Sequence, residues 1–336
     1  MMEFVTFGEI MLRLTPSQKG GKLLLAQEFA LGYAGAESNV AVSLSFLGNK
    51  VSFASKVPNN PMGKAALLGL NQFGVSTDNV LLGGHRMGTY FIELGASIRP
   101  SRVVYDREGS AISQMESGEL DWDAILQNTK WLHLSGITPA LSDQCAKESI
   151  LAAETAKKYG VKVSFDLNFR RTLWPNGKTA RDIFDAIIAN SDVIFGNLGA
   201  LDDVYDLKFS GKDGMERTER AMLKASNLFG VKNLAFTIRE HRSASQNKLQ
   251  GAALKDNETF FSKPYEIQVE DRFGTGDAFA AAYLHSLNKG WEVEKAVEFA
   301  TAAFALKHTI NGDLHTSTEE EILSVVDGNL SGHVIR

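Results

Sequence analysis

The segment Asp271–Leu284 has the residue types and spacing to hold a phosphate group. Gly274, Thr275 and Gly276 stand immediately before an alanine-rich run with helical periodicity that begins near Asp277. Small residues let a backbone approach an anion closely, and the first amides of a helix point outward without intrahelical partners. The helix dipole adds positive potential at the same place, so the segment predicts a cradle for phosphate.

The carboxylate of Asp277 falls on the first turn of that helix, within reach of a hydroxyl group held against the cradle. A carboxylate in this position can take the hydroxyl proton while the oxygen attacks a γ-phosphate. The cradle amides would stabilise charge on the transferred phosphoryl group. The alternative is an ordinary acidic residue at a helix start, and the short motif alone favours that alternative.

The surrounding pattern alternates strands and helices, which is typical of a parallel sheet covered by helices. Strands are expected over 5–13, 51–57, 131–135, 161–166, 193–195 and 234–238. Helices are expected over 38–46, 62–73, 142–159, 178–190, 277–287, 293–307 and 318–326.

Two β-rich runs, Thr89–Leu94 and Arg102–Arg107, interrupt this alternation. The residues between them, 95–101, include Pro100 and favour a turn. The region therefore predicts an inserted hairpin, which could cover a site at the edge of the main sheet.

A second glycine-rich motif, Gly32–Ala41, runs into the first predicted helix. Together with Asp271–Asp277 it resembles the paired signatures of the ribokinase-like, or PfkB, carbohydrate kinases. The resemblance covers essentially the whole chain. It implies one α/β domain over 1–336, a ribokinase-like three-layer sandwich with a mostly parallel central sheet. It also implies a small β-sheet lid, formed by about 10–34 and 86–113, that closes over a sugar, with ATP and Mg²⁺ as partners in the reaction.

Within the family, several segments are similar to the 2-keto-3-deoxygluconate kinases. That similarity implies ATP-dependent phosphorylation of a sugar acid, 2-keto-3-deoxygluconate, to its 6-phosphate, with Asp277 as the base. The segments are Phe7–Arg13, Val57–Pro61, Arg102–Arg107 with Gly109–Ala111, Ser135–Thr138, and Asp166–Arg170 with Leu173 and Trp174.

A sugar acid needs a cation beside its carboxylate, and a guanidinium matches a carboxylate with two parallel hydrogen bonds. Arg107 on the predicted lid and Arg170 after a core strand are the candidates. Tyr90 and Tyr105 could supply hydroxyl contacts and flat apolar cover. The alternatives are a solvated arginine on a strand and tyrosines that only pack within the lid.

The resemblance assigns further sugar contacts to Gly35, Asn39 and Asp313. Asn39 could instead cap a helix, and Asp313 could belong to a plain turn. On the nucleotide side, the resemblance assigns Asn168, Thr237 and Arg239, with Gly274 and Gly276 at the phosphates. The loop after Arg239 lacks the glycines common in relatives.

The metal site departs from the family pattern, because Ala200 stands where an acidic residue is common. Asp202 and Asp203 follow closely and could compensate, or the phosphates and water could hold most of the magnesium shell. No protein ligand for magnesium is assigned. The residues also leave open a bound monovalent cation beside Asp271.

The composition argues against several classes of protein. The net charge is −5, and no basic block of the kind that follows a nucleic-acid backbone is present. A single cysteine, Cys145, and the lack of a signal-peptide or membrane-span pattern predict a cytoplasmic protein without membrane partners. Exposed edges on the lid predict a homo-oligomer, a dimer or higher.

Three rival functions remain at this point. A kinase of the same family could act on a neutral sugar such as fructose or ribose. A regulator on this fold could bind sugar or nucleotide without catalysis. A dinucleotide-dependent oxidoreductase is disfavoured, because no Gly-x-Gly-x-x-Gly motif follows the first predicted strand.

Overall fold

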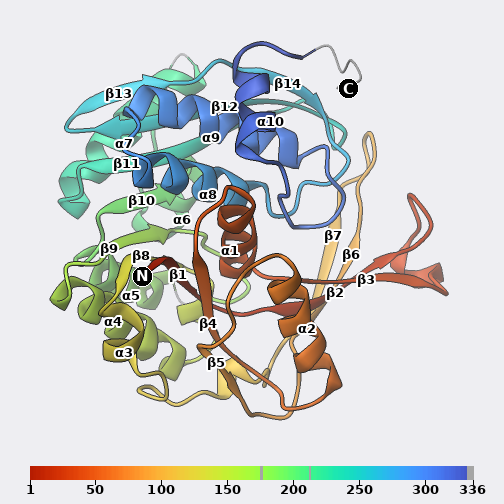
Figure 1. Cartoon of the computed structure of the whole chain (residues 1–336). Coiled ribbons are helices and arrows are strands. Elements are labelled where there is room, and N and C mark those ends of the chain that lie inside the picture. Colours follow the sequence, from red (N-terminus) through yellow and green to blue (C-terminus); the bar gives the residue numbers. More distant parts are fainter. Residues whose placement is uncertain (175–176, 212, 331–336) are drawn as a thin grey trace.

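The structure is a computed structural model that describes residues 1–174, 177–211 and 213–330. Ten strands of the described chain form one main sheet, in the order β13-β12-β11-β10-β9-β8-β1-β4-β5, with β14 paired to β12 (Figure 1). Neighbours from β11 to β5 are parallel, whereas β12 pairs antiparallel with β11, β13 and β14. The strands are β1 Met2–Phe7, β4 Val51–Val57, β5 Val80–Leu82, β8 Thr129–Ser135, β9 Lys162–Asp166, β10 Val193–Gly196, β11 Asn233–His241, β12 Gln246–Lys255, β13 Glu258–Phe261 and β14 Tyr265–Gln268.

Helices cover both faces of this sheet and bury two separate hydrophobic clusters against it. One face carries α1 Ala36–Phe46, α2 Pro61–Gln72, α8 Thr275–Asn288, α9 Val293–Lys307 and α10 Glu319–Val326. The other carries α3 Trp122–Leu126, α4 Asp143–Lys158, α5 Gly177–Ile188, α6 Leu198–Tyr205 and α7 Gly214–Phe229. This three-layer α/β arrangement confirms the predicted fold class.

A second sheet of four strands projects from the main body, in the order β3-β2-β6-β7 (Figure 1). Its strands are β2 Met11–Pro16, β3 Phe29–Ala34, β6 Thr89–Glu93 and β7 Arg102–Asp106. The antiparallel pairing of β6 with β7 confirms the predicted hairpin. All four strands fall within the two segments expected to form the lid. We call this unit the small sheet.

The prediction of one strand over 5–13 is wrong, because the chain leaves the main sheet after Phe7 and enters the small sheet at Met11. Gly8 sits at the exit, where a β-carbon would overlap the Glu37 carboxyl group. Both halves of the run are apolar, so the pattern alone does not reveal the break. Helices α6 and α7 and the antiparallel strands β12 to β14 are further elements that the sequence pattern did not indicate.

Candidate active site

A cavity of about 720 Å³ lies between the small sheet and the carboxyl ends of the parallel strands β9 and β10. Ligands of open α/β sheets bind at this end of the strands. All of the predicted site residues line it: Gly35, Asn39, Tyr90, Tyr105, Arg107, Asn168, Arg170, Thr237, Arg239, Gly274, Thr275, Gly276, Asp277 and Asp313. Chain segments far apart in the sequence therefore meet around one space, as the paired motifs predicted.

The cradle forms at the start of α8, where Gly274 is the N-cap residue with left-handed backbone (φ 70°). No side chain within the described ranges caps this helix, so its first amides face the cavity without a described side-chain partner. The Thr275 hydroxyl donates to the Arg272 carbonyl (3.0 Å), which closes the turn. A β-carbon on Gly274 would overlap the backbone carbonyl of Asp313, so both the backbone angle and the close approach require glycine.

Alanine substitutions at Gly274 and Gly276 should show which of these two glycines the fold itself requires. Gly274→Ala should lower the free energy of unfolding by about 2 kcal/mol or more, because it adds strain and overlap. Gly276→Ala is the matched control, since its β-carbon would meet no atom of the described residues within 4 Å. Thermal denaturation of both variants checks this, and equal melting temperatures would contradict the account.

Asp277 is buried in the first turn of α8, and its Oδ2 accepts a hydrogen bond from Asn39 Nδ2 (2.7 Å). Burial raises the pKa of Asp277 to about 8, and the charges of Asp166, Asp313 and Glu37 add to this increase. The Asn39 hydrogen bond acts in the opposite direction and lowers the pKa. A carboxylate tuned toward neutral pH, beside a phosphate cradle, has the properties of a general base.

Asn39 does not cap helix α1, whose N-cap is Gly35. Its side chain instead links the two motifs, since Oδ1 accepts from the Gly35 amide (3.3 Å) while Nδ2 donates to Asp277. Gly35 has extended backbone, and a β-carbon there would overlap the Glu9 carbonyl oxygen. Glycine is needed at this position because the loop between β1 and β2 passes directly over it.

Immediately after strand β7, Arg107 forms a buried ion pair with Glu9, whose second oxygen accepts from the Ser110 hydroxyl (2.5 Å). The guanidinium also lies over the Tyr105 ring (5.6 Å), and the Tyr90 and Tyr105 rings stack with centroids 6.0 Å apart. Arg107 Nε is buried without a hydrogen-bond partner among the described residues. Part of this guanidinium is therefore unsatisfied beside the cavity, although Glu9 already neutralises its charge.

Arg170 and Arg171 diverge after strand β9. Arg170 is exposed and lines the cavity, and its guanidinium donates to the Phe169 carbonyl (3.1 Å). Arg171 instead pairs with Asp203 on α6. Of these two arginines, Arg170 is therefore the one that lines the cavity.

Arg13 is a buried residue whose contacts the sequence did not indicate. From strand β2 its guanidinium reaches two carboxylates, pairing with Asp313 and with Asp271 Oδ2 (2.6 Å). Burial raises the pKa of Asp313, whereas the charge of Arg13 lowers it. Asp313 therefore lines the cavity as one half of an ion pair and is more than a plain turn residue.

The nucleotide-side candidates lie on strands β9 and β11 and the loops after them. Asp166 Oδ1 accepts from the Asn168 amide (3.1 Å), which orders the loop that follows β9. Arg239 donates to the Thr275 hydroxyl (3.0 Å) and lies over the Phe304 ring (5.2 Å). Burial lowers the pKa of Arg239 to about 10, and the neighbouring charge of Arg272 contributes. The guanidinium thus joins the cradle to the apolar wall of α9.

His308 follows α9 as a packed residue. Its Nδ1 bonds to the Phe304 carbonyl (2.7 Å), its ring stands edge-on to the Phe304 ring, and it does not line the cavity. Burial lowers its pKa to about 3, so it is neutral at physiological pH. His308 therefore belongs to the packed interior beside α9.

Residues 1–315 match the profile of the pfkB family of carbohydrate kinases. The chain belongs to this family. It is similar to the 2-dehydro-3-deoxygalactonokinase of Haloferax volcanii, with 34% identity over 98% of each chain. Among solved structures it is similar to the 2-dehydro-3-deoxygluconokinase of Thermotoga maritima, with a TM-score of 0.95, 39% identity and coverage of 98% of this chain and 100% of that one. A pfkB family carbohydrate kinase from Listeria grayi matches with a TM-score of 0.90 and 33% identity over 97% of this chain and 99% of that chain.

In this pfkB kinase the described residues contain no cluster of three or more side chains able to hold a metal ion. Asn197 is the N-cap of α6, and its side-chain oxygen accepts from the Ala200 amide (3.0 Å), which gives Asn197 a structural role. Position 200 itself is alanine and supplies no carboxylate for a metal ion. Asp166, Asp203 and Asp277 are carboxylates that line the cavity, and Asp203 is held by Arg171. Asp202 does not line it, so of the two proposed substitutes only Asp203 is in position.

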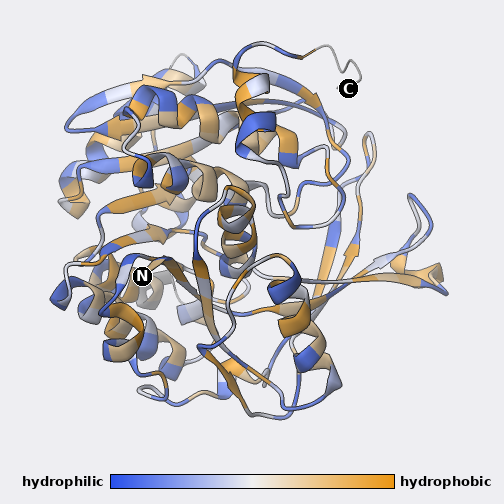
Figure 2. Ribbon diagram, in the orientation of Figure 1, coloured by the Kyte–Doolittle hydropathy of each residue, from blue (hydrophilic) through white to orange (hydrophobic). Residues whose placement is uncertain are grey.

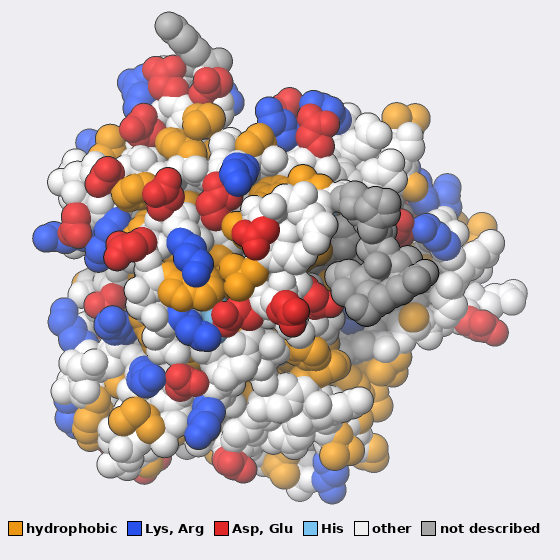
Figure 3. Space-filling view, turned by 45° about the horizontal axis from the view of Figure 1, so that its top comes forward, with side chains coloured by type: hydrophobic (Ala, Val, Ile, Leu, Met, Phe, Trp, Pro, Cys, Tyr) orange, Lys and Arg blue, Asp and Glu red, His pale blue; other side chains and the backbone are white. Residues whose placement is uncertain are grey.

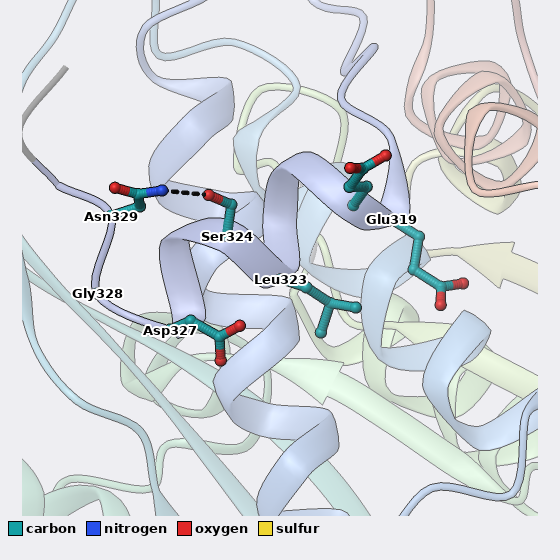
Figure 4. A pocket seen from close by; sticks show the side chains of 7 residues that line it. Glu319, Leu323, Ser324, Asp327, Gly328 and Asn329 are labelled. Carbon is teal, nitrogen blue, oxygen red and sulfur yellow. Dashed lines mark hydrogen bonds between the residues drawn. The ribbon is translucent and has the colours of Figure 1, made fainter. Parts of the chain in front are cut away.

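A second hollow of about 750 Å³ lies over α10 and the turn after it (Figure 4). It contains none of the predicted residues. Ser324 accepts from Asn329 (3.0 Å), and Glu319 pairs with His285 and Lys289.

On the face of the kinase shown in Figure 3, acidic and basic side chains are interspersed without a block of one sign. Across the described ranges, no helix is both long and apolar enough to span a membrane.

Proposed function

We propose that this chain is an ATP-dependent kinase of a sugar acid, with 2-keto-3-deoxygluconate as its substrate and Asp277 as its base. The observation that carries the proposal is the Asn39–Asp277 hydrogen bond, which holds a buried carboxylate of raised pKa at the cradle. Two relatives add support through their names, which specify 2-dehydro-3-deoxygluconate, the same compound, and its galactonate epimer. Both names describe a sugar acid.

In the proposed reaction, the terminal hydroxyl of the sugar acid donates its proton to Asp277 as its oxygen attacks the γ-phosphate. Asn39 orients the carboxylate through its hydrogen bond. The amides of Gly274, Thr275 and Gly276 stabilise charge on the phosphoryl group as it transfers. Exclusion of water from the cavity prevents it from competing as the acceptor.

For the substrate, we assign the carboxylate of the sugar acid to Arg107 and Arg170, with Tyr90 and Tyr105 beside its carbon chain. Asp313 and Gly35 would border its remaining hydroxyls. The Arg107 Nε, which has no described hydrogen-bond partner, and the exposed Arg170 guanidinium supply N–H donors at the cavity. A bound carboxylate needs such donors for its two oxygens.

For the nucleotide, we assign Asn168, Thr237 and Arg239 to ATP, next to the cradle glycines Gly274 and Gly276. Magnesium would neutralise phosphate charge when bound, and the residues fit it because one or two carboxylates plus phosphates and water suffice for this ion. Asp166 and Asp203 are the cavity carboxylates that could hold it or its water shell.

The pH dependence of kcat/KM should report Asp277. Because its pKa is raised to about 8, the group is protonated and inactive as a base below that pH. We expect kcat/KM to fall by about tenfold per pH unit below about pH 8. Asn39→Ala removes the hydrogen bond that lowers this pKa, so the decrease of kcat/KM at low pH should begin at a higher pH in this variant. A decrease that begins near the ordinary pKa of aspartate, and that Asn39→Ala does not shift, would contradict the role of Asp277 as the base.

We also propose that the small sheet acts as the lid and joins two copies of the chain. Its register aligns Leu31, Leu14, Phe91 and Val104 as an apolar row across all four strands, on the opposite face from Tyr90 and Tyr105. Leu31 and Val104 are exposed (57% and 53%), and hydrophobic residues are visible along this projecting sheet in Figure 2. Two exposed edge strands, β3 and β7, border the row.

Sedimentation of the purified protein tests this assembly. We expect the wild type to sediment as a dimer or larger and Leu31→Glu with Val104→Glu to sediment as a monomer, because charges would enter the apolar interface. Leu68→Glu, an exposed position on α2, is the control and should keep the wild-type state. A monomeric wild type would refute the proposal.

We further propose that the kinase works in the cytoplasm. Its single cysteine, Cys145, is a buried free thiol, which suits a reducing compartment, and ATP is available there.

The function is tested by ADP release measured with a panel of acceptors. The panel contains 2-keto-3-deoxygluconate, its galactonate epimer, fructose and ribose. We expect kcat/KM for a keto-deoxy acid to exceed that for either neutral sugar by about 100-fold or more, since a neutral sugar would leave the Arg107 Nε donor and the Arg170 guanidinium without the carboxylate that they are proposed to bind. A preference for fructose or ribose would favour the neutral-sugar kinase, and no release with any acceptor would favour a binding protein.

A further inference from the structure

Two buried cations lie behind the cradle, next to the carboxylates of Asp271 and Asp313. Arg13 pairs with both, as described above. Lys307, the last residue of α9, is fully buried (0% exposed), and its Nζ donates to the Ile310 carbonyl (2.9 Å). Burial lowers the pKa of Lys307, and the charges of Asp271 and Asp313 oppose that decrease most strongly. Two positive and two negative groups therefore balance one another here.

The surroundings of Asp271 do not fit the monovalent cation that the sequence left open. Such an ion binds carboxylate and carbonyl oxygens, but the Asp271 carboxylate oxygens and the Ile310 carbonyl oxygen already accept hydrogen bonds. Asp271 Oδ1 accepts from the Phe273 amide (3.0 Å), and Oδ2 accepts from Arg13 and from the Gly312 amide (3.0 Å). The nearby Ile310 carbonyl accepts the hydrogen bond from Lys307 Nζ.

These contacts also brace the cradle. The His308 carbonyl accepts from the amides of Glu270 (2.8 Å) and Asp271 (3.2 Å), which joins the end of α9 to the loop before the cradle. At the other end of the same segment, the Asp313 carbonyl packs against Gly274 so closely that no side chain fits. The segment 308–313 thus forms the wall behind the phosphate site, and Lys307 and Arg13 hold its charges in place.

We propose that Lys307 and Arg13 supply the fixed positive charge that a bound monovalent cation would otherwise supply, so that turnover needs no K⁺. Lys307 is then a positioning residue, which acts on the cradle through the segment 308–313. The inference rests on the proposed kinase function for its activity readout, but its binding readout needs no substrate.

Turnover in different chloride salts tests the proposal. ADP release by the wild type with 2-keto-3-deoxygluconate should agree within about twofold in KCl, NaCl and choline chloride at equal ionic strength. Lys307→Ala leaves room for a small cation, so its kcat should fall by about tenfold or more in choline chloride and recover in part with K⁺ or NH₄⁺. Lys295→Ala, an exposed residue on the same helix, is the control and should match the wild type in every salt.

Several outcomes would overturn the proposal. These are K⁺ activation of the wild type, wild-type turnover by Lys307→Ala, or a loss in Lys307→Ala that neither cation relieves, which would assign the lysine a purely structural role. If the variant does not fold, the wild-type salts decide alone. The melting temperature of the wild type adds a readout that requires no turnover: specific K⁺ binding would raise it above the value in choline chloride, and the proposal predicts equal values. Failure of the kinase function would instead appear as no ADP release in any salt.

Discussion

Asp277→Asn should lower kcat by about 1,000-fold or more while leaving ATP binding within a few-fold of the wild type. The amide cannot accept the hydroxyl proton, but it is nearly the same size and can still accept the hydrogen bond from Asn39. The amides proposed to contact phosphate belong to the backbone, so the substitution leaves them in place. Single-turnover ADP formation gives the rate, and titration with a fluorescent ATP analogue gives the affinity.

The same variant should be more stable than the wild type at neutral pH. The folded-state pKa of Asp277, about 8, lies above its ordinary unfolded value, so the folded protein binds a proton that the unfolded chain has lost. Protonated Asp277 therefore gives its full contribution to the free energy of unfolding below the pKa of the unfolded chain, and this contribution decreases as the pH rises through about 8. Asparagine carries no charge, so the variant avoids the free-energy cost of burying an ionisable carboxyl group, and we expect its free energy of unfolding to be higher by on the order of 2 kcal/mol at pH 7.

Asp182→Asn, at an exposed position on α5, is the matched control and should change neither turnover nor stability. Wild-type turnover by Asp277→Asn would eliminate the assignment of the base. Loss of turnover together with a large loss of stability would show that Asp277 is a structural residue of the helix start instead.

Arg170→Met should raise KM for 2-keto-3-deoxygluconate by about 10- to 100-fold, the value of a charge-assisted hydrogen bond to the carboxylate. The effect should fall on the sugar acid and leave KM for ATP unchanged. Arg170 is the cleaner site for this test because it is exposed and has no ion pair among the described contacts. Arg107 is less suitable, since its removal would leave Glu9 as an uncompensated buried charge.

Arg171→Met is the neighbouring control. It removes the same charge one residue away, but its guanidinium is held by Asp203, so KM for the sugar acid should stay within about twofold of the wild type. An unchanged KM in Arg170→Met, or equal effects of the two substitutions, would contradict recognition of an acid by Arg170.

The sequence was most informative where short motifs carry backbone requirements. The glycines around Gly274 and Gly35 allow close approach of the backbone, and the two motifs that contain them pointed to residues that line one cavity. The Asn39–Asp277 bond joins those halves directly, which neither motif indicates alone. The strand and helix periodicity around them was strong enough to predict the three-layer fold.

Tertiary contacts explain what the sequence did not indicate. Arg13 stands in a strand pattern without any local sign that its partners, Asp271 and Asp313, lie near the other end of the chain. Lys307 is the last residue of an apolar helix, and the sequence alone suggests an ordinary exposed lysine at a helix end, whereas the structure buries it completely. The run 5–13 reads as one strand because apolar residues stand on both sides of Gly8, and only the close contact of Gly8 with Glu37 in the folded chain marks where the main sheet ends.

Phosphorus NMR of the reaction products tests the central claim most directly. The wild type, incubated with ATP, magnesium and 2-keto-3-deoxygluconate, should form a phosphomonoester whose ³¹P signal is split by the two protons of a terminal CH₂ group. The signal should appear together with ADP and be absent with Asp277→Asn. Inorganic phosphate in place of the ester, or an ester on a different carbon, would contradict transfer from the cradle to a terminal hydroxyl of the sugar acid.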